Sequence, residues 1–184
     1  MPATAYLSLG SNLGNRGQNL REAVRRLQAL GTIRSISSIY ETEPVEFTDQ
    51  PMFLNSALEL ETAANPDQLM EHLLVIEKTM GRQRTQKKGP RVIDLDILLF
   101  ADQVVNTPTL TIPHPAMHQR RFVLEPLTEI APETKHPVLK KTAKELLEAL
   151  PRGQTVKRLG KMDGAVQEWQ ATNDRRPTTR FTGE

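Results

Sequence analysis

The pattern of hydrophobic and polar positions divides the chain into strands and helices. Leu20, Val24 and Leu27 recur at the three- and four-residue intervals of a helix face, whereas β-branched or alternating runs bounded by Gly and Pro are typical of strands. Five strands are predicted, over residues 3–9, 33–43, 53–61, 91–100 and 110–112. Three helices are predicted, over about 16–30, 65–80 and 142–150, and residues 122–127 are helical or irregular. The order βαββαβ of the first six elements is typical of a ferredoxin-like α+β sandwich, with helices on one face of a mainly antiparallel sheet.

Length and composition indicate one soluble domain. The chain has 184 residues, and we expect a single domain over 1–160 followed by a polar C-terminal extension, 161–184, that is partly disordered. No segment approaches the roughly 18 apolar residues of a membrane span, and the N-terminus has no basic start. The absence of cysteine excludes disulfides and a Cys nucleophile and fits a reducing compartment. We therefore expect a cytoplasmic protein, without a membrane partner and monomeric.

The charge balance gives no reason to expect nucleic acid as a partner. The chain has 24 Lys and Arg against 22 Asp and Glu, a formal net charge of +2. Such a small surplus does not create the strong positive field that nucleic-acid binding uses.

Two carboxylates interrupt the apolar run at 91–100. Because side chains alternate along a strand, Asp94 and Asp96 project on one face while Ile93, Leu95 and Ile97 project on the other. Two adjacent, half-buried carboxylates repel each other and lose hydration, so a hard divalent cation between them is predicted. The alternative is that this Asp-x-Asp only caps, turns or faces solvent.

A basic loop stands directly before the carboxylates. Five cations occur in residues 82–91: Arg82, Arg84, Lys87, Lys88 and Arg91. Beside a metal site they are placed to bind the oxygens of a polyphosphate, with arginine offering bidentate contacts. The alternative is a solvated loop whose charges simply pair with Asp94 and Asp96.

Two further segments have sequence features that can be interpreted either as ligand-binding or as structural. His114 lies between two prolines on a rigid, non-helical segment, which suits a group that points at a ligand, although a structural histidine is also compatible. The segment 10–15 lacks the spacing of a phosphate-binding glycine loop, so it is interpreted as a structural turn.

Five ordered blocks resemble one enzyme family. The segments are 6–14, 38–44, 50–55, 89–100 and 113–127, and the resemblance covers about residues 3–150. Together they resemble 6-hydroxymethyl-7,8-dihydropterin pyrophosphokinase, a folate-pathway enzyme. The resemblance implies a ferredoxin-like fold and transfer of pyrophosphate from ATP to the pterin hydroxymethyl group, with release of AMP.

The resemblance also implies roles for individual residues. Asp94 and Asp96 would bind two Mg²⁺ ions that bridge the phosphates of ATP, the co-substrate, and Arg82 and Arg91 would be the catalytic cations. The implied ATP-binding residues are Arg84, Ile97, Leu110, Thr111, His114 and Arg120. The implied pterin-binding residues are Thr42, Pro44, Val45, Phe53, Asn55 and Phe122, of which Phe53 and Phe122 would stack on the two ring faces.

Other functions were compared with this one. A nucleic-acid-binding ferredoxin-like module needs exposed aromatics on its sheet, but the chain has one Trp, two Tyr and five Phe and no aromatic-rich strand. Another Asp-x-Asp transferase would share the metal but not Phe53, Asn55 and Phe122. A pseudoenzyme is disfavoured because both predicted catalytic arginines and both carboxylates are present.

Overall fold

A computed structural model of the chain describes residues 1–44, 49–82 and 89–162. The β-strands are β1 (Ala3–Ser11), β2 (Thr32–Ile36), β3 (Ile39–Thr42), β4 (Phe53–Thr62), β5 (Asp94–Phe100), β6 (Val105–Asn106), β7 (Thr111–Ile112) and β8 (Val156–Gly160). The α-helices are α1 (Arg16–Leu27), α2 (Pro66–Thr79), α3 (Arg121–Ile130) and α4 (Ala143–Glu148), with 3₁₀ turns at Gln28–Leu30 and Met117–Gln119.

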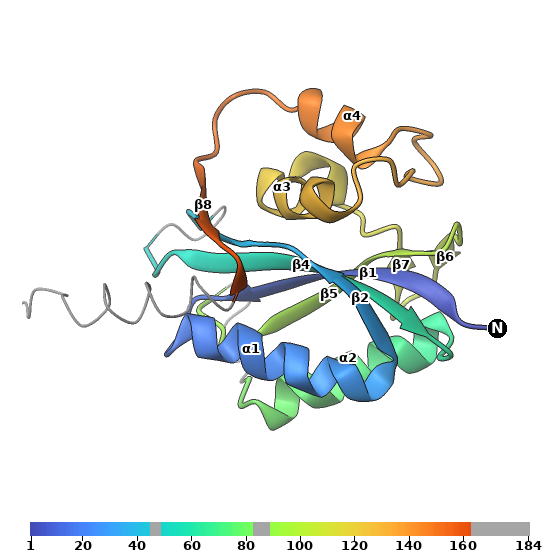
Figure 1. Cartoon of the computed structure of the whole chain (residues 1–184), viewed down its shortest axis with the longest axis horizontal. Coiled ribbons are helices and arrows are strands. Elements are labelled where there is room, and N and C mark those ends of the chain that lie inside the picture. The colour runs from blue at the N-terminus through green and yellow to red at the C-terminus, as the bar shows by residue number, and fades with distance from the viewer. Residues whose placement is uncertain (45–48, 83–88, 163–184) are drawn as a thin grey trace, which may run out of the picture.

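The main sheet runs in the order β5-β1-β4-β3-β8, with β2 also pairing with β4 (Figure 1). Every strand pair that the structure describes is antiparallel, and β6 and β7 form a separate two-stranded ribbon. The predicted α+β fold with a mainly antiparallel sheet is confirmed.

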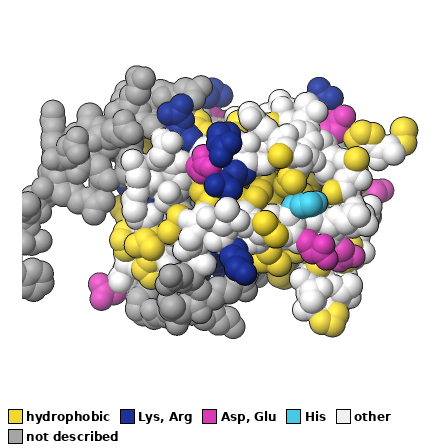
Figure 2. All heavy atoms as spheres, turned by 90° about the horizontal axis from the view of Figure 1, so that it is seen from below, with side chains coloured by type: hydrophobic (Ala, Val, Ile, Leu, Met, Phe, Trp, Pro, Cys, Tyr) yellow, Lys and Arg dark blue, Asp and Glu magenta, His cyan; other side chains and the backbone are white. Residues whose placement is uncertain are grey.

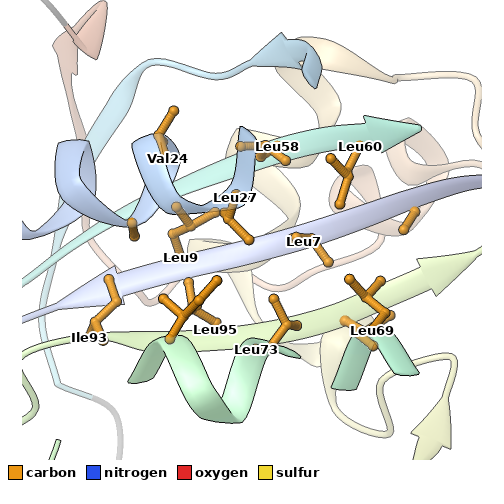
Figure 3. Packing of buried hydrophobic residues seen from close by; sticks show 14 of the residues in the cluster. Leu7, Leu9, Val24, Leu27, Leu58, Leu60, Leu69, Leu73, Ile93 and Leu95 are labelled. Atoms are coloured by element: carbon orange, nitrogen blue, oxygen red, sulfur yellow. The ribbon is translucent and has the colours of Figure 1, made fainter. Parts of the chain in front are cut away.

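Helices α1 and α2 cover one face of this sheet. Leu7 and Leu9 of β1 lie between side chains of the two helices, among them Leu27 of α1 and Leu73 of α2 (Figure 3). All four are fully buried. Helix α2 begins as predicted, with Pro66 in the first turn. A capping box precedes it, in which the Gln68 backbone N–H donates to the Asn65 side chain and the Asn65 backbone N–H donates to the Gln68 side chain.

Helices α3 and α4 cover the opposite face, which corrects the expectation of helices on one face only (Figure 1). Leu124 of α3 and Leu146 of α4 pack with Ala57 of β4 and Leu98 of β5 in a second buried cluster. The reason is that β4 and β5 carry apolar residues on both faces at their centres, and a second apolar face must also be buried. Helix α4 lies within the segment predicted as helical and begins with a capping box between Thr142 and Glu145.

The strand predictions differ from the structure in three places, one of which is the two-residue β6, which was not predicted. The single strand expected at 33–43 is divided into β2 and β3, because Ser37 and Ser38 leave the ladder and bond elsewhere. Strand β8 was not predicted at all, and it pairs with β3 at the edge of the sheet. All but the first two residues of the expected C-terminal extension lie outside the described part of the chain.

The outer surface of the α1 and α2 layer is mixed in charge. Glu22 pairs with Arg25 and Arg26 at 2.7 and 2.8 Å, and Figure 2 shows Lys and Arg on this face interspersed with acidic, apolar and neutral side chains. Among the described helices, none is long and apolar enough to cross a bilayer.

Candidate active site

Strand register brings the predicted metal ligands and the predicted acceptor residues onto one face of the sheet. Asp94 of β5 pairs with Gly10 of β1, Gly10 pairs with Asn55 of β4, and Asn55 pairs with Tyr40 of β3. Asp96 lies opposite Ser8, two residues along from this row. Because the alternate residues of β1 and β5 belong to the core under α1 and α2, the row and Asp96 face the α3 side.

Asp94 is held by two arginines that flank the basic loop. Arg82 Nη1 lies 2.8 Å from Asp94 Oδ1, and Arg91 Nη1 lies 2.9 Å from Asp94 Oδ2. Arg82 also pairs with Glu77 of α2, whose side chain is only 4% exposed. The structure thus brings both predicted catalytic cations onto one carboxylate. Residues 83–88, including the predicted ATP-binding Arg84, lie outside the described part of the chain.

Asp96 has a different environment. Burial, and secondly the charge of Asp94, raise the pKa of Asp96 from 3.8 to about 7, while Arg120, Arg82 and Arg91 oppose this rise. Among the described residues, no cation lies within ion-pair distance of its carboxylate. The buried carboxylate therefore has incomplete charge compensation, a condition that a bound cation relieves.

The pair fits a magnesium site that is completed by substrate. Mg²⁺ is commonly held by one or two carboxylates together with water and phosphate oxygens, rather than by a cage of protein ligands. The described residues contain no group of three or more His, Cys, Asp or Glu side chains placed to share a metal ion. Asp94 and Asp96 project on the same face, and arginines that can bind phosphate lie beside them.

Asn12 fixes the backbone of Arg91. Its side chain is 1% exposed; Oδ1 accepts from Arg91 N at 2.7 Å, and Nδ2 donates to Gln50 Oε1 at 2.8 Å and to the Pro51 carbonyl at 3.1 Å. The backbone N–H of Asn12 also donates to the carbonyl of Arg91 at 3.0 Å. The turn that follows β1 is therefore structural, as the sequence indicates, and it joins Arg91, a predicted catalytic cation, to the segment that precedes Phe53.

The predicted acceptor residues form a group on β3 and β4. Asn55 Nδ2 donates to Thr42 Oγ1 at 2.6 Å, so the amide has a fixed orientation. A Cβ added to Gly10 would lie 3.0 Å from Asn55 Oδ1, which shows how closely β1 approaches this amide. The Phe53 ring lies under the Arg91 guanidinium, 5.8 Å from Cζ to the ring centre.

Other predicted acceptor residues are placed less directly. Phe122, at the start of α3, lies under the guanidinium of Arg120 at 5.5 Å. Pro44 is half-buried just after β3, and Val45 lies outside the described residues.

His114 is a neutral hydrogen-bonding group in this structure. Burial, and secondly Arg120, lower its pKa from 6.5 to about 4, although Asp94 acts in the opposite direction. Nδ1 accepts from the Ala116 N–H at 3.1 Å, so the proton is on Nε2, which can donate to a ligand. The backbone N–H of His114 bonds Leu98 of β5 at 2.9 Å and keeps the histidine beside the carboxylate strand.

The residues expected near adenine and ribose lie beyond the carboxylates along the chain. Ile97 and Leu110 are buried in the core cluster under α1 and α2, and Thr111 is exposed on β7. The Ile97 side chain therefore points away from the face that carries Asp96.

Sequence reasoning missed several residues that organise this site. They are Gly10, Asn12, Gln50 and Glu77. Glu77 had a detectable signal, because an acidic residue falls on the buried face of a helix otherwise marked by Leu69, Leu73 and Ile76.

Comparison with known proteins identifies the family. A family model described as 7,8-dihydro-6-hydroxymethylpterin-pyrophosphokinase matches residues 6–132. A Bacillus subtilis protein named 2-amino-4-hydroxy-6-hydroxymethyldihydropteridine pyrophosphokinase is 50% identical over 128 residues, which are 68% of this chain and 77% of the relative. A protein of the same name from Aquifex aeolicus is 41% identical over 143 residues, 78% of this chain and 89% of the relative.

Longer proteins contain the same unit. The folic acid synthesis protein fol1 of Schizosaccharomyces pombe is 43% identical over 149 residues, but this chain spans only 20% of its length. A solved structure of wild-type Plasmodium falciparum HPPK-DHPS with pterin and p-hydroxybenzoate superposes with a TM-score of 0.66 at 20% identity, over 80% of this chain and 43% of the other. At that identity the superposition supports the fold alone. By its sequence matches, the chain belongs to the 7,8-dihydro-6-hydroxymethylpterin-pyrophosphokinase family.

Proposed function

We propose that this protein transfers pyrophosphate from ATP to the hydroxymethyl group of 6-hydroxymethyl-7,8-dihydropterin, releasing AMP, in a Mg²⁺-dependent step of folate biosynthesis. Membership of a pyrophosphokinase family supports the reaction type. The observation that carries the proposal is the row across the sheet, in which Asp94, with its two arginines, lies two strands from Asn55. A polyphosphate site and an aromatic-lined acceptor site on one rigid sheet suit a transfer between two bound small molecules.

On the donor side, Asp94 and Asp96 would hold two Mg²⁺ ions. When bound there, such ions would supply the positive charge that a polyphosphate needs in order to bind beside two carboxylates. Arg82 and Arg91 would bind the β- and α-phosphates and stabilise the charge that develops during transfer. Each has its guanidinium within 3 Å of an Asp94 oxygen, so a short side-chain movement would bring it to a phosphate beside that carboxylate.

The remaining nucleotide contacts would come from the segments around β5 and β7. His114 would donate from Nε2 to a phosphate oxygen, and Arg120 would add a cationic contact beside it. Ile97, Leu110, Thr111 and Arg84 would complete the adenine, ribose and phosphate contacts. For the buried Ile97 and Leu110, backbone groups rather than side-chain tips would face the nucleotide.

On the acceptor side, Asn55 would present its amide to the polar edge of the pterin. With Nδ2 bonded to Thr42, the Oδ1 atom is left to accept from ring N–H groups. Phe53 and Phe122 would stack on the two faces of the ring, and Pro44 and Val45 would border its edge. Both aromatic rings lie under arginines, so an acceptor bound to them would be close to cations that attract the transferring phosphates.

The test is to mix the protein with ATP, Mg²⁺ and the dihydropterin, and to identify the nucleotide product by ion-exchange chromatography. AMP should form only when all three are present, and chelation of Mg²⁺ should stop it. Formation of ADP, or the absence of any nucleotide product, would contradict the proposal.

We propose a monomer over a domain at 1–160, located in the cytoplasm and acting on small molecules rather than nucleic acid. Sedimentation of the full chain at micromolar concentration measures its oligomeric state directly.

A further inference from the structure

Strand β8 lies beyond the part of the chain that the family model matches, yet it pairs with the strand that carries Thr42. The family match ends at residue 132, whereas β8 spans Val156–Gly160. In the register, Val156 pairs with Thr42 and Arg158 pairs with Tyr40. The C-terminal segment therefore supports the edge of the acceptor site from outside.

Arg158 ties this strand to the start of β3. Its Nε donates to Ser38 Oγ at 3.0 Å, and its Nη2 lies 2.7 Å from Glu129 Oε1 of α3. Glu129 in turn accepts from the backbone N–H of Ser38 and, at 2.6 Å, from its hydroxyl. Ser38 is fully buried and the Glu129 side chain is 16% exposed, so the bonds between these two residues lie largely away from water, whereas the Arg158 side chain covers them from the surface.

The neighbouring Ser37 attaches the same bend to β4. Its N–H donates to the Ala57 carbonyl at 2.8 Å, and its hydroxyl lies 3.0 Å from that of Ser56. The bend between β2 and β3 is thus fixed to β4 on one side and to α3 and β8 on the other. Four residues later, β3 reaches Thr42, whose hydroxyl accepts from the Asn55 amide.

We propose that Arg158 is a positioning residue for the pterin: through Ser38 and Glu129 it holds β3 in the place where Thr42 orients the Asn55 amide. This inference rests on the proposed function. If β3 moves relative to β4, Asn55 Nδ2 loses its acceptor and the amide is free to rotate, which removes a matched acceptor from the pterin edge. The carboxylates lie on β5, on the far side of β1 from Asn55, so nucleotide binding should change little.

The test compares charge reversal at two edge arginines. In Arg158→Glu the new carboxylate faces Glu129, and in Arg158→Ala the contacts are simply removed. Arg34 provides the matched control, because it pairs with Glu61 at 3.0 Å between β2 and β4, toward the other end of β4. Arg34→Glu and Arg34→Ala therefore impose the same chemical change away from the acceptor site.

Calorimetry on the full chain would measure two dissociation constants. The first is the dissociation constant of the dihydropterin, measured with Mg²⁺ and saturating α,β-methylene ATP, an ATP analogue that cannot transfer pyrophosphate. The second is the dissociation constant of this ATP analogue. For Arg158→Glu we expect the pterin constant to rise about tenfold and the nucleotide constant to stay within about twofold. Arg158→Ala should lie between this variant and wild type, and Arg158→Lys, which keeps the ion pair, should lie near wild type.

Three outcomes would overturn the inference while leaving the proposed function intact. The first is a pterin dissociation constant in Arg158→Glu that equals that of wild type. The second is a loss of affinity in Arg158→Glu that is as large for the nucleotide analogue as for the pterin. The third is a rise of the pterin dissociation constant in Arg34→Glu that is as large as in Arg158→Glu. Circular dichroism at the assay temperature establishes that each variant is folded, and the mild Arg158→Ala change, at a side chain 57% exposed, gives a second reading. Wild-type protein that binds no pterin and forms no AMP would instead refute the proposed function itself.

Discussion

Asp94 and Asp96 are chemically identical side chains on the same face of one strand, but their surroundings give them different properties. Asp94 is paired with two arginines, whereas Asp96 has no ion-pair partner among the described residues and has a pKa raised to about 7 by burial and by the charge of Asp94. Each pKa unit corresponds to about 1.4 kcal/mol of difference between the two protonation states. Keeping Asp96 ionised without a bound cation therefore destabilises the fold.

We expect Asp96→Asn to stabilise the metal-free protein at high pH while abolishing AMP formation. Because the folded-state pKa is raised from 3.8 to about 7, the stabilising contribution of protonated Asp96 is complete below about pH 4 and lost as pH rises through 7. The uncharged Asn avoids this loss, so its melting temperature should exceed that of wild type by roughly 3 °C or more at pH 8.

Thermal melts of both proteins in chelator, at pH 5 and pH 8, measure this difference. The difference in melting temperature between Asp96→Asn and wild type should be larger at pH 8 than at pH 5. If the variant melts below wild type at pH 8, or if the difference in melting temperature does not change with pH, charge on Asp96 does not destabilise the metal-free protein.

Arg82→Ala should affect chemistry more than nucleotide binding. A cation that acts on developing charge contributes mainly in the transition state, so we expect kcat to fall at least about 100-fold and the dissociation constant of α,β-methylene ATP to rise less than about fivefold. Single-turnover AMP formation and calorimetry measure the two effects. Arg25→Ala, at an exposed arginine of α1, is the control and should change neither kcat nor the dissociation constant. If Arg82→Ala lowers only the affinity for the nucleotide and leaves kcat unchanged, the role proposed for Arg82 is contradicted.

The sequence was most informative about residues whose chemistry is visible in their spacing. The alternation around Asp94 and Asp96 correctly placed both on one face, and Arg82 and Arg91 were correctly associated with that strand. Asn12 could not be assigned in this way, because its importance depends on contacts with Gln50 and Arg91, which are 38 and 79 residues away. Such long-range contacts leave no periodic signal in a single sequence.

Among the elements, the edge strand β8 was the least predictable. Only Val156 and Leu159 are apolar within its five residues, and both are merely half-buried. An edge strand needs little apolar surface when an existing strand supplies its hydrogen bonds, so the polar composition of these five residues gave no strand signal. The division between β2 and β3 was hidden for a related reason, since serine is compatible with a strand and leaves it here only because α3 and β4 supply partners.

The turn before α4 should respond to pH through His136. Its Nδ1 accepts from the backbone N–H groups of Val138 and Leu139 at 3.2 and 3.0 Å, which requires the neutral ring. Burial, and secondly the neighbouring His118, lower the His136 pKa from 6.5. The unfolded chain therefore binds the proton more readily, and the free energy of unfolding should decrease as pH falls below about 6.5.

Hydrogen exchange of the Val138 and Leu139 amides at pH 7.5 and pH 5.5, corrected for the intrinsic pH dependence, measures this effect. Protection should decrease at the lower pH, and a His136→Asn variant should lose that dependence. The capping amide of Glu145 in α4 serves as an internal reference. Equal pH dependence at all three amides would indicate a global effect and contradict the local role of His136.

At the scale of the whole molecule, one sheet separates two cores. The prediction from sequence found the first, because α1 and α2 have clear apolar stripes, but it placed helices on one face only. The second core is smaller, and its helices have six and ten residues, one of them with Pro126 inside. The sequence predicted a helix at 142–150 and a helical or irregular segment at 122–127, but such short segments, one with an interior proline, gave no signal that they form a second layer on the opposite face of the sheet.

Nucleotide and metal should stabilise the whole fold together. A ligand present at 100 times its dissociation constant and bound only by the folded state adds about 2.7 kcal/mol to the free energy of unfolding. For a chain of this length the melting temperature should then rise by roughly 5 to 10 °C with Mg²⁺ and α,β-methylene ATP. Differential scanning fluorimetry measures the shift, which chelation should largely remove; an equal shift with the nucleotide in chelator would argue against metal-dependent binding.

The row from Asp94 through Gly10 to Asn55 has a consequence for substrate choice. Neighbouring strands lie about 4.8 Å apart, so backbone hydrogen bonds set the interval between the phosphate and acceptor positions at roughly 10 Å. Because this interval is set by the backbone, side-chain substitution cannot lengthen it. If Asn55 binds the acceptor as proposed, engineering at Phe53 or Phe122 could admit an acceptor of altered ring shape, but the reactive hydroxyl of that acceptor would still have to lie at the same distance from the ring edge that faces Asn55.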